Sequence, residues 1–253
     1  MQAAERSVAV SVVSVVSVVT VVGTSGGLGA SVLAAAVSQR ARRAAVPTVL
    51  VDGCPLAGGL DVTMGLEHED GVRWPDLSEL TGVASGSALV ERLPGATGVP
   101  VLSFDRRRRT PSPEVVSAVL TGLGSVCRLL VVDAPPSGVV TDAALALGGQ
   151  VLVVAGVSVR QLSALAVVAE LLAQRQTSVA VCLRGPGGAR GRPVRRVVEA
   201  EIGLPVVAVL EDDRSVEADL VRGCAPGARG GGALVRAADQ ILGWAVLAEG
   251  QVG

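Results

Sequence analysis

The chain of 253 residues has the length of one large α/β domain, because single hydrophobic cores stop growing near this size. It is 49% hydrophobic, with 32 Gly and only 1% aromatic residues, so we expect a core of Val, Leu and Ala, as in a parallel sheet buried on both faces. The formal net charge of −1 excludes a general electrostatic attraction to nucleic acid or to an anionic membrane.

The chain begins with an apolar Val/Ser run at residues 7–22. This run falls short of the roughly 20 apolar residues that a membrane-spanning helix needs. It also leads into a glycine loop rather than into a cleavage site. We therefore expect a low-complexity lead-in over residues 1–16, one domain over residues 17–248, and a tail over residues 249–253.

Apolar runs then alternate with helical segments to the end of the chain, which predicts repeated βα units and a mostly parallel sheet. Strands are predicted over residues 17–22, 48–51, 99–104, 129–132, 151–155, 179–183 and 206–210. Helices are predicted over residues 30–43, 113–123, 142–147, 160–175, 193–202, 215–222 and 233–247. The glycine-rich, acidic stretch over residues 53–98 is the longest irregular part, and we expect it to cover the mouth of a site.

The four cysteines form no CxxC pair, which favours reduced thiols over disulfides or a metal site and indicates a cytoplasmic chain. They are Cys54, Cys127, Cys182 and Cys224.

The most informative segment is the glycine loop that follows the first predicted strand. It contains four glycines within seven positions, from Gly23 to Gly29, and a helix is predicted to start at Ala30. Such a turn aims consecutive backbone N–H groups and a helix N-terminus at one point, where they can bind a phosphate group. The predicted nucleotide-binding residues are Ser25, Gly26, Gly27, Leu28, Gly29, Ala30 and Ser31.

Three interpretations of this loop remain open on its residues alone. It could be a tight βα turn without a ligand, although four glycines exceed what a turn needs. Gly23, Gly27 and Gly29 match the spacing of the short-chain dehydrogenases, and Asp52 ends the next strand where a ribose-binding carboxylate would lie. The chain contains no Tyr and no Lys, which excludes a working dehydrogenase of that class but not a dinucleotide-binding protein. The third interpretation is a P-loop.

The segment Ser25-Gly-Gly-Leu-Gly-Ala-Ser31 resembles the deviant Walker A loop of the ParA/MinD ATPases, Lys-Gly-Gly-x-Gly-Lys-Ser/Thr. Both lysines are replaced, by Ser25 and by Ala30, whereas Ser31 keeps the hydroxyl that would bind Mg²⁺. Asp52-Gly-Cys54-Pro is similar to the second acidic motif of that family, Asp-x-Asp-Pro, with Cys54 in place of the second Asp.

Two further segments carry the same resemblance, which covers about residues 17–245. Residues 128–136 are similar to the Walker B motif, a hydrophobic strand that ends in Asp133. Residues 210–223 lie where the family has its Pro-x-Asp segment, with Glu211 in place of Pro and Asp213 as a candidate nucleotide contact. The segment Gly71-Val-Arg-Trp-Pro-Asp-Leu77 and the lysine-free loop suggest the actinobacterial CpaE/TadZ-like and septum-site-determining (Ssd) branch.

The resemblance implies a three-layer α/β/α sandwich of the P-loop NTPase type, with nucleotide at the carboxyl ends of the strands. It implies an ATP site in which Ser31 and Asp133 lie close together and hold Mg²⁺, with Asp52 as the catalytic carboxylate. The resemblance also implies a homodimer that has protein partners in the division or pilus machinery. Its expected location is the pole or septum of the cell, where it could contact the membrane peripherally. Nucleic acid is not expected as a partner.

The missing lysines, and Cys54 in place of a carboxylate, point to a degenerate nucleotide-binding regulator or scaffold whose hydrolysis is weak or absent. Two alternatives stay open: an active Mg-ATPase of the ParA/MinD type, and a dinucleotide-binding protein without dehydrogenase activity.

Overall fold

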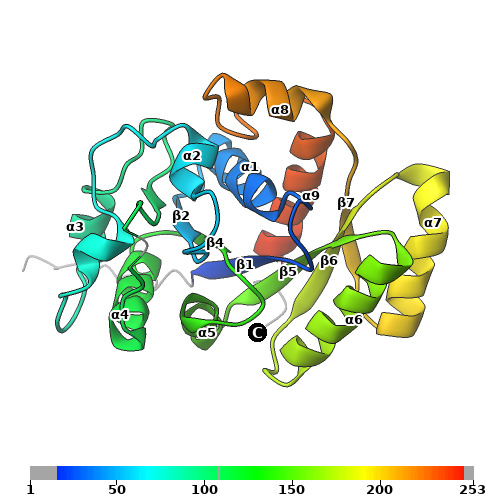
Figure 1. Ribbon diagram of the computed structural model, residues 1–253, viewed down its shortest axis with the longest axis horizontal. Coiled ribbons are helices and arrows are strands. Elements are labelled where there is room, and N and C mark those ends of the chain that lie inside the picture. The colour runs from blue at the N-terminus through cyan, green and yellow to red at the C-terminus, as the bar shows by residue number, and fades with distance from the viewer. Residues whose placement is uncertain (1–15, 108, 248–253) are drawn as a thin grey trace, which may run out of the picture.

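A parallel sheet of seven strands forms the centre of the protein, in the order β3-β2-β4-β1-β5-β6-β7 (Figure 1). The computed structural model describes residues 16–107 and 109–247. The strands are β1 (Ser17–Gly23), β2 (Thr48–Asp52), β3 (Val101–Leu102), β4 (Leu129–Asp133), β5 (Gln150–Gly156), β6 (Val179–Arg184) and β7 (Val206–Leu210). The predicted three-layer α/β architecture is confirmed.

Helices connect these strands and cover both faces of the sheet (Figure 1). The helices described are α1 (Ala30–Arg43), α2 (Leu60–Met64), α3 (Gly86–Val90), α4 (Pro113–Gly124), α5 (Val139–Ala146), α6 (Val159–Ala173), α7 (Gly188–Val197), α8 (Arg214–Val221) and α9 (Ala233–Leu247). A 3₁₀ turn, η1 (Trp74–Leu77), and a π-helical turn, η2 (Val198–Ile202), complete them.

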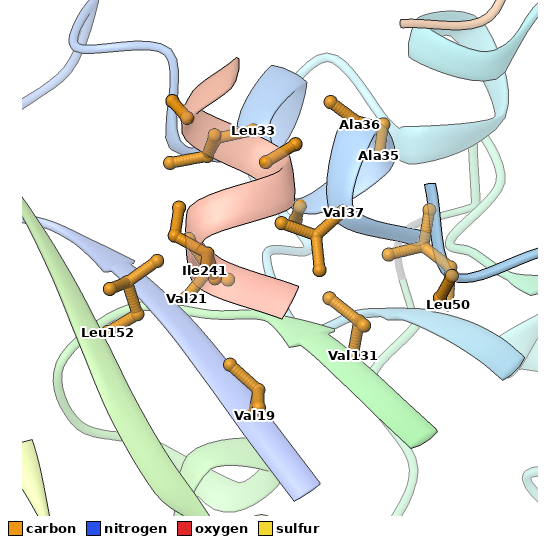
Figure 2. Packing of buried hydrophobic residues seen from close by; sticks show 14 of the residues in the cluster. Val19, Val21, Leu33, Ala35, Ala36, Val37, Leu50, Val131, Leu152 and Ile241 are labelled. Carbon is orange, nitrogen blue, oxygen red and sulfur yellow. The ribbon is translucent and has the colours of Figure 1, made fainter. Parts of the chain in front are cut away.

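The two faces of the sheet have separate cores, because alternate strand residues point to opposite sides. On one face, β-strand Val and Leu side chains pack against α1, α2 and α9. Figure 2 shows this core, in which Val21 and Leu152 of the sheet face Leu33 of α1 and Ile241 of α9. On the other face α4 and α5 cover one half of the sheet and α6 covers the other. Valine, leucine and alanine dominate both cores, as the composition predicts.

The edge strand β3 is shorter than the predicted strand over residues 99–104. It pairs only with β2, and the carbonyl of Ser103 accepts a hydrogen bond from the backbone N–H of Trp74 (3.0 Å) instead of continuing the ladder. The neighbouring irregular stretch over residues 53–98 contains α2, η1 and α3, which are too short to show a helical period in the sequence.

The prediction of a helix over residues 193–202 is wrong at its start. It places Pro193 at the first helical position, which proline favours. In the structure Pro193 lies inside α7, which begins at Gly188, and the chain then continues as the π-helical turn η2. Part of the glycine-rich stretch over residues 185–191 is therefore helical.

No helix among the described residues is long and apolar enough to cross a membrane. The predicted tail over residues 249–253, and all of the predicted lead-in except Val16, lie outside the described residues.

Candidate functional site

The glycine loop between β1 and α1 has the backbone geometry of an anion site. Gly27 and Gly29 have φ angles of 79° and 84°, a left-handed conformation that glycine adopts without steric cost. Gly29 is the N-cap residue of α1, and because glycine has no side chain, no side chain caps the helix. Within the described chain, the backbone N–H groups of residues 25–32 donate to no protein acceptor. The loop therefore presents a run of free donors at the positive end of a helix dipole.

Asp133 ends β4 beside this loop, and the structure brings it together with Ser31 as expected. β1 and β4 are neighbours, with Val21 in register with Asp133. The Ser31 hydroxyl of α1 hydrogen-bonds to the Asp133 carboxylate. Burial raises the pKa of Asp133 to about 6, and the bond from Ser31 partly offsets that rise. A hydroxyl and a carboxylate thus meet at the first turn of α1, a donor set that fits a hard divalent cation.

Asp52 ends β2 directly beside Asp133, with which it is in register. Both of its carboxylate oxygens accept backbone N–H groups, from Cys54 (2.8 Å) and from Leu60 (3.0 Å). Burial, more than the nearby acidic charges, raises the pKa of Asp52 to about 7. The role predicted for Asp52 is catalytic, but the two amide bonds show that its carboxylate also holds the turn between β2 and α2.

Trp74 is a residue of this site that the sequence does not predict. It is fully buried, and its indole Nε1 donates to the backbone carbonyl of Asp52 (2.7 Å). The segment over residues 53–98 therefore packs on the end of β2. The only feature of the sequence that draws attention to Trp74 is the segment from Gly71 to Leu77. That segment suggests a branch of the family and does not indicate a structural role for Trp74.

Gly53 and Cys54 bring the β2–α2 turn close to β4. The backbone N–H of Gly53 donates to the carbonyl oxygen of Asp133 (2.6 Å), and a Cβ at this position would lie 2.8 Å from the Cβ of Ala134. The Cys54 sulfur lies 3.9 Å from the same Asp133 carbonyl oxygen. Burial, together with the charges of Asp133 and Asp52, raises the pKa of Cys54 to about 12, so its side chain is a neutral thiol near neutral pH.

Asp213, a predicted nucleotide contact, has another role in the structure. One of its oxygens accepts the Ser215 hydroxyl (2.6 Å) at the start of α8, and the other accepts the Ala233 amide (2.9 Å) at the start of α9. The bond from Ser215, helped by these amides, lowers the pKa of Asp213. The carboxylate joins two helix N-termini, and Asp213 also lines a cavity beside the glycine loop, so its role as a nucleotide contact stays a prediction.

A cavity of about 360 Å³ opens beside the glycine loop. Gly27 and Gly29 form one wall, and the segment after β7 forms the other. Arg184 reaches its rim, where it bonds the Asp212 carboxylate (2.7 Å). The remaining walls combine apolar side chains with charged residues, and they are Val32, Leu210, Val216, Leu220 and Leu234 together with Asp213, Arg214 and Glu217.

A second cavity, of about 270 Å³, is lined in part by the β2–α2 turn. Cys54 borders it, and charged side chains of both signs line the rest, among them Asp61, Glu67, Arg73 and Arg107.

Comparison with known proteins places these features in a recognised fold. No family model matches the chain. Two uncharacterized proteins, from two strains of Mycobacterium tuberculosis, are 36% identical to it over 192 residues, which is 72% of this chain and 51% of each relative. The chain thus spans about half the length of the curated relatives it matches.

Solved structures match over nearly the whole chain. A ParA family ATPase from Chlorobium tepidum superposes with a TM-score of 0.72 at 18% identity, over 91% of this chain and 98% of that one. MinD in a MinC:MinD cell division complex from Aquifex aeolicus gives 0.70 at 16%, over 90% and 96%. The septum site-determining protein MinD of Pyrococcus horikoshii, solved with Mg-ADP, gives 0.65 at 14%, over 90% and 94%. The chain has the fold of the ParA/MinD ATPases.

Proposed function

We propose that this chain is a degenerate nucleotide-binding protein of the ParA/MinD type that binds ATP and hydrolyses it weakly or not at all. The observation that carries the proposal is the run of free backbone N–H groups over residues 25–32, placed beside the Ser31–Asp133 pair at the carboxyl ends of β1 and β4. In open parallel sheets ligands bind at this edge.

The phosphates and the base of a nucleotide would contact different surfaces of this site. The phosphates would lie on the glycine loop, bound by backbone N–H groups and the dipole of α1. The base would occupy the adjoining cavity of about 360 Å³, whose apolar side chains and Arg184 suit a flat, polar-edged ring. Ser31 and Asp133 would hold Mg²⁺, which neutralises phosphate charge when it is bound.

The side chains needed for turnover are missing. Ser25 and Ala30 supply no cation where the family has lysines, and each charge-assisted hydrogen bond to phosphate that a lysine would make contributes roughly 1.5–3 kcal/mol. Cys54 cannot orient a water molecule as a carboxylate would, because a thiol is a weak hydrogen-bond acceptor and burial opposes its ionisation. Phosphoryl transfer depends on positioning and on charge stabilisation, so binding can persist while hydrolysis is lost.

The biological setting is proposed from the relatives. Structural neighbours include a MinD complexed with its partner MinC and a septum site-determining protein. By analogy we propose that this chain forms a homodimer in the cytoplasm and acts at the pole or septum, where it regulates or localises protein partners of division or pilus assembly. An active Mg-ATPase is the second candidate, favoured by the retained Ser31–Asp133 pair.

Binding of ATP and of NAD to the purified chain tests the proposal. We expect ATP to bind and NAD to fail, and Gly27→Ala to weaken ATP binding. Gly203→Ala is the matched control, because both glycines have positive φ angles (79° and 76°) and open space around an added Cβ, but Gly203 lies far from the loop. Equal ATP binding in both variants, or binding of NAD instead, would contradict the proposal. A phosphate-release assay separates it from the active ATPase.

A further inference from the structure

Three potential metal ligands converge where β2 and β4 end. One carboxylate oxygen each from Asp52 and Asp133 and the sulfur of Cys54 lie within 4.8 Å of one another. The close contact of Gly53 with β4 places Cys54 there. A Mg²⁺ site is built from oxygen atoms alone, whereas this group contains sulfur.

The two carboxylates are deeply buried without a balancing cation. Asp52 is 1% exposed and Asp133 is 4% exposed. The charged side chains that raise the pKa of Asp52 are Asp133 and Asp61, both acidic. Among the described residues, no arginine forms an ion pair with Asp52 or Asp133. Two buried negative groups side by side repel each other and lose hydration, so a bound cation would remove most of this cost.

The remaining bonding capacity of these groups fits a metal. A carboxylate offers about four lone-pair sites, and Asp52 uses two for backbone amides while Asp133 accepts the Ser31 hydroxyl. The Cys54 sulfur has only one long contact, to the Asp133 carbonyl oxygen. Cys54 is partly exposed and borders the charged cavity of about 270 Å³, so this ligand of the group is reached from solvent.

We propose that Asp52, Cys54 and Asp133 form a site for a thiophilic divalent ion of the Zn²⁺ type, which this chain binds in preference to Mg²⁺. The inference rests on the cation position of the proposed function and changes the identity of its metal. Zn²⁺ accepts mixed sulfur and oxygen ligands in a tetrahedron, with water or a further ligand completing it, whereas Mg²⁺ demands six oxygens in an octahedron. Binding converts the Cys54 thiol to a thiolate, and its proton passes to solvent.

Titration of the nucleotide-free chain with Co²⁺ tests this site, because Co²⁺ takes the ligands of Zn²⁺ and its bond to a thiolate absorbs in the near ultraviolet. We expect one equivalent of Co²⁺ to produce this band, Zn²⁺ to abolish it, and a large excess of Mg²⁺ to leave it. Cys54→Ser should remove the band, and Asp133→Asn should weaken Co²⁺ binding tenfold or more. Cys224→Ser, at the other partly exposed thiol, should leave the band unchanged.

A second variant, Cys54→Asp, keeps the inference testable if Cys54→Ser fails to fold. Cys54→Asp restores an all-oxygen set, so it should lose the band and bind Mn²⁺ or Mg²⁺ more tightly than the wild type does. Absence of the band in the wild type, its persistence in Cys54→Ser, or displacement of Co²⁺ by equimolar Mg²⁺ would overturn the inference. ATP binding measured in excess Mg²⁺ without Co²⁺ tests the proposed function separately, since absence of ATP binding with an intact Co²⁺ band would overturn only that function.

Discussion

The buried carboxylate of Asp133 should make the metal-free protein less stable as the pH rises. Its pKa is 3.8 in an unfolded chain and about 6 in the folded one. Between these two pH values the folded state binds more protons than the unfolded state. The contribution of Asp133 to the stability of the folded protein is therefore complete below about pH 4 and is lost as the pH rises through about 6. Asp52, raised to about 7, acts in the same direction.

Asp133→Asn should remove much of this pH dependence. A pKa rise from 3.8 to about 6 corresponds to about 3 kcal/mol at a pH above both values. This value already includes the hydrogen bond from Ser31, which favours the charged carboxylate. At about pH 8 the variant should therefore be about 3 kcal/mol more stable than the wild type, and near pH 4 the two should be similar.

Urea unfolding followed by circular dichroism in EDTA, at pH values from about 4 to about 8, measures this difference. Asp142→Asn serves as the control, because Asp142 is exposed on the surface and pairs with Arg175. We expect that variant to follow the wild-type curve. A wild-type stability that rises toward pH 8, or an Asp133→Asn curve parallel to that of the wild type, would refute the electrostatic reasoning.

Three other substitutions test separate parts of the site. Ala30→Lys should tighten ATP binding roughly tenfold or more in an ATP titration, because it restores a cation beside the phosphate loop, yet should leave phosphate release undetectable. Gly53→Ala should lower the free energy of unfolding by about 1–3 kcal/mol in urea melts, because the new Cβ would lie 2.8 Å from Ala134. Trp74→Phe should cost about 1–3 kcal/mol in the same assay, because it leaves the Asp52 carbonyl without its donor.

Each of these substitutions has a control or an outcome that contradicts it. Unchanged ATP affinity in a folded Ala30→Lys variant would argue against phosphate at this loop. Gly58→Ala lies in the same turn as Gly53 with nothing within 4 Å of the added Cβ, so it should be close to neutral. Trp244→Phe removes the other indole, which is partly buried on α9, and an equal loss of stability there would show that the Trp74 hydrogen bond contributes little.

Much of the fold was predictable because its strands and helices follow from residue patterns over short stretches of the sequence. Six of the seven strands lie where buried Val/Leu runs predicted them, since strands of a parallel sheet are covered on both faces and read as continuous apolar segments. The glycine loop was also predictable, because its glycines occupy the turn between a strand and a helix. The failures lie where local patterns are weak, at the edge strand β3 and at Pro193 inside α7.

The contacts of the site were less predictable. The family resemblance implied that Asp133 and Ser31 would meet, because Asp133 ends one strand and Ser31 lies in the first turn of the helix that follows the end of another. The sequence did not reveal that Asp213 caps two helices, because the amide of Ala233 that it accepts comes from a distant part of the chain. Trp74 was equally unpredictable. Its partner is the backbone carbonyl of Asp52, and every residue has such a carbonyl, so the side chains in the sequence do not indicate this contact.

The sequence by itself determined the parallel α/β architecture, the glycine-rich turn after the first strand and the lack of lysine, because each of these is a property of residue type and short-range order. Only the tertiary structure decided which groups share one environment. The strand order sets Asp52 beside Asp133, and Gly53 closes the turn that adds Cys54 to them. Burial then raises the pKa of all three, since a pKa depends on the water and charges that the fold removes or supplies and not on the residue alone.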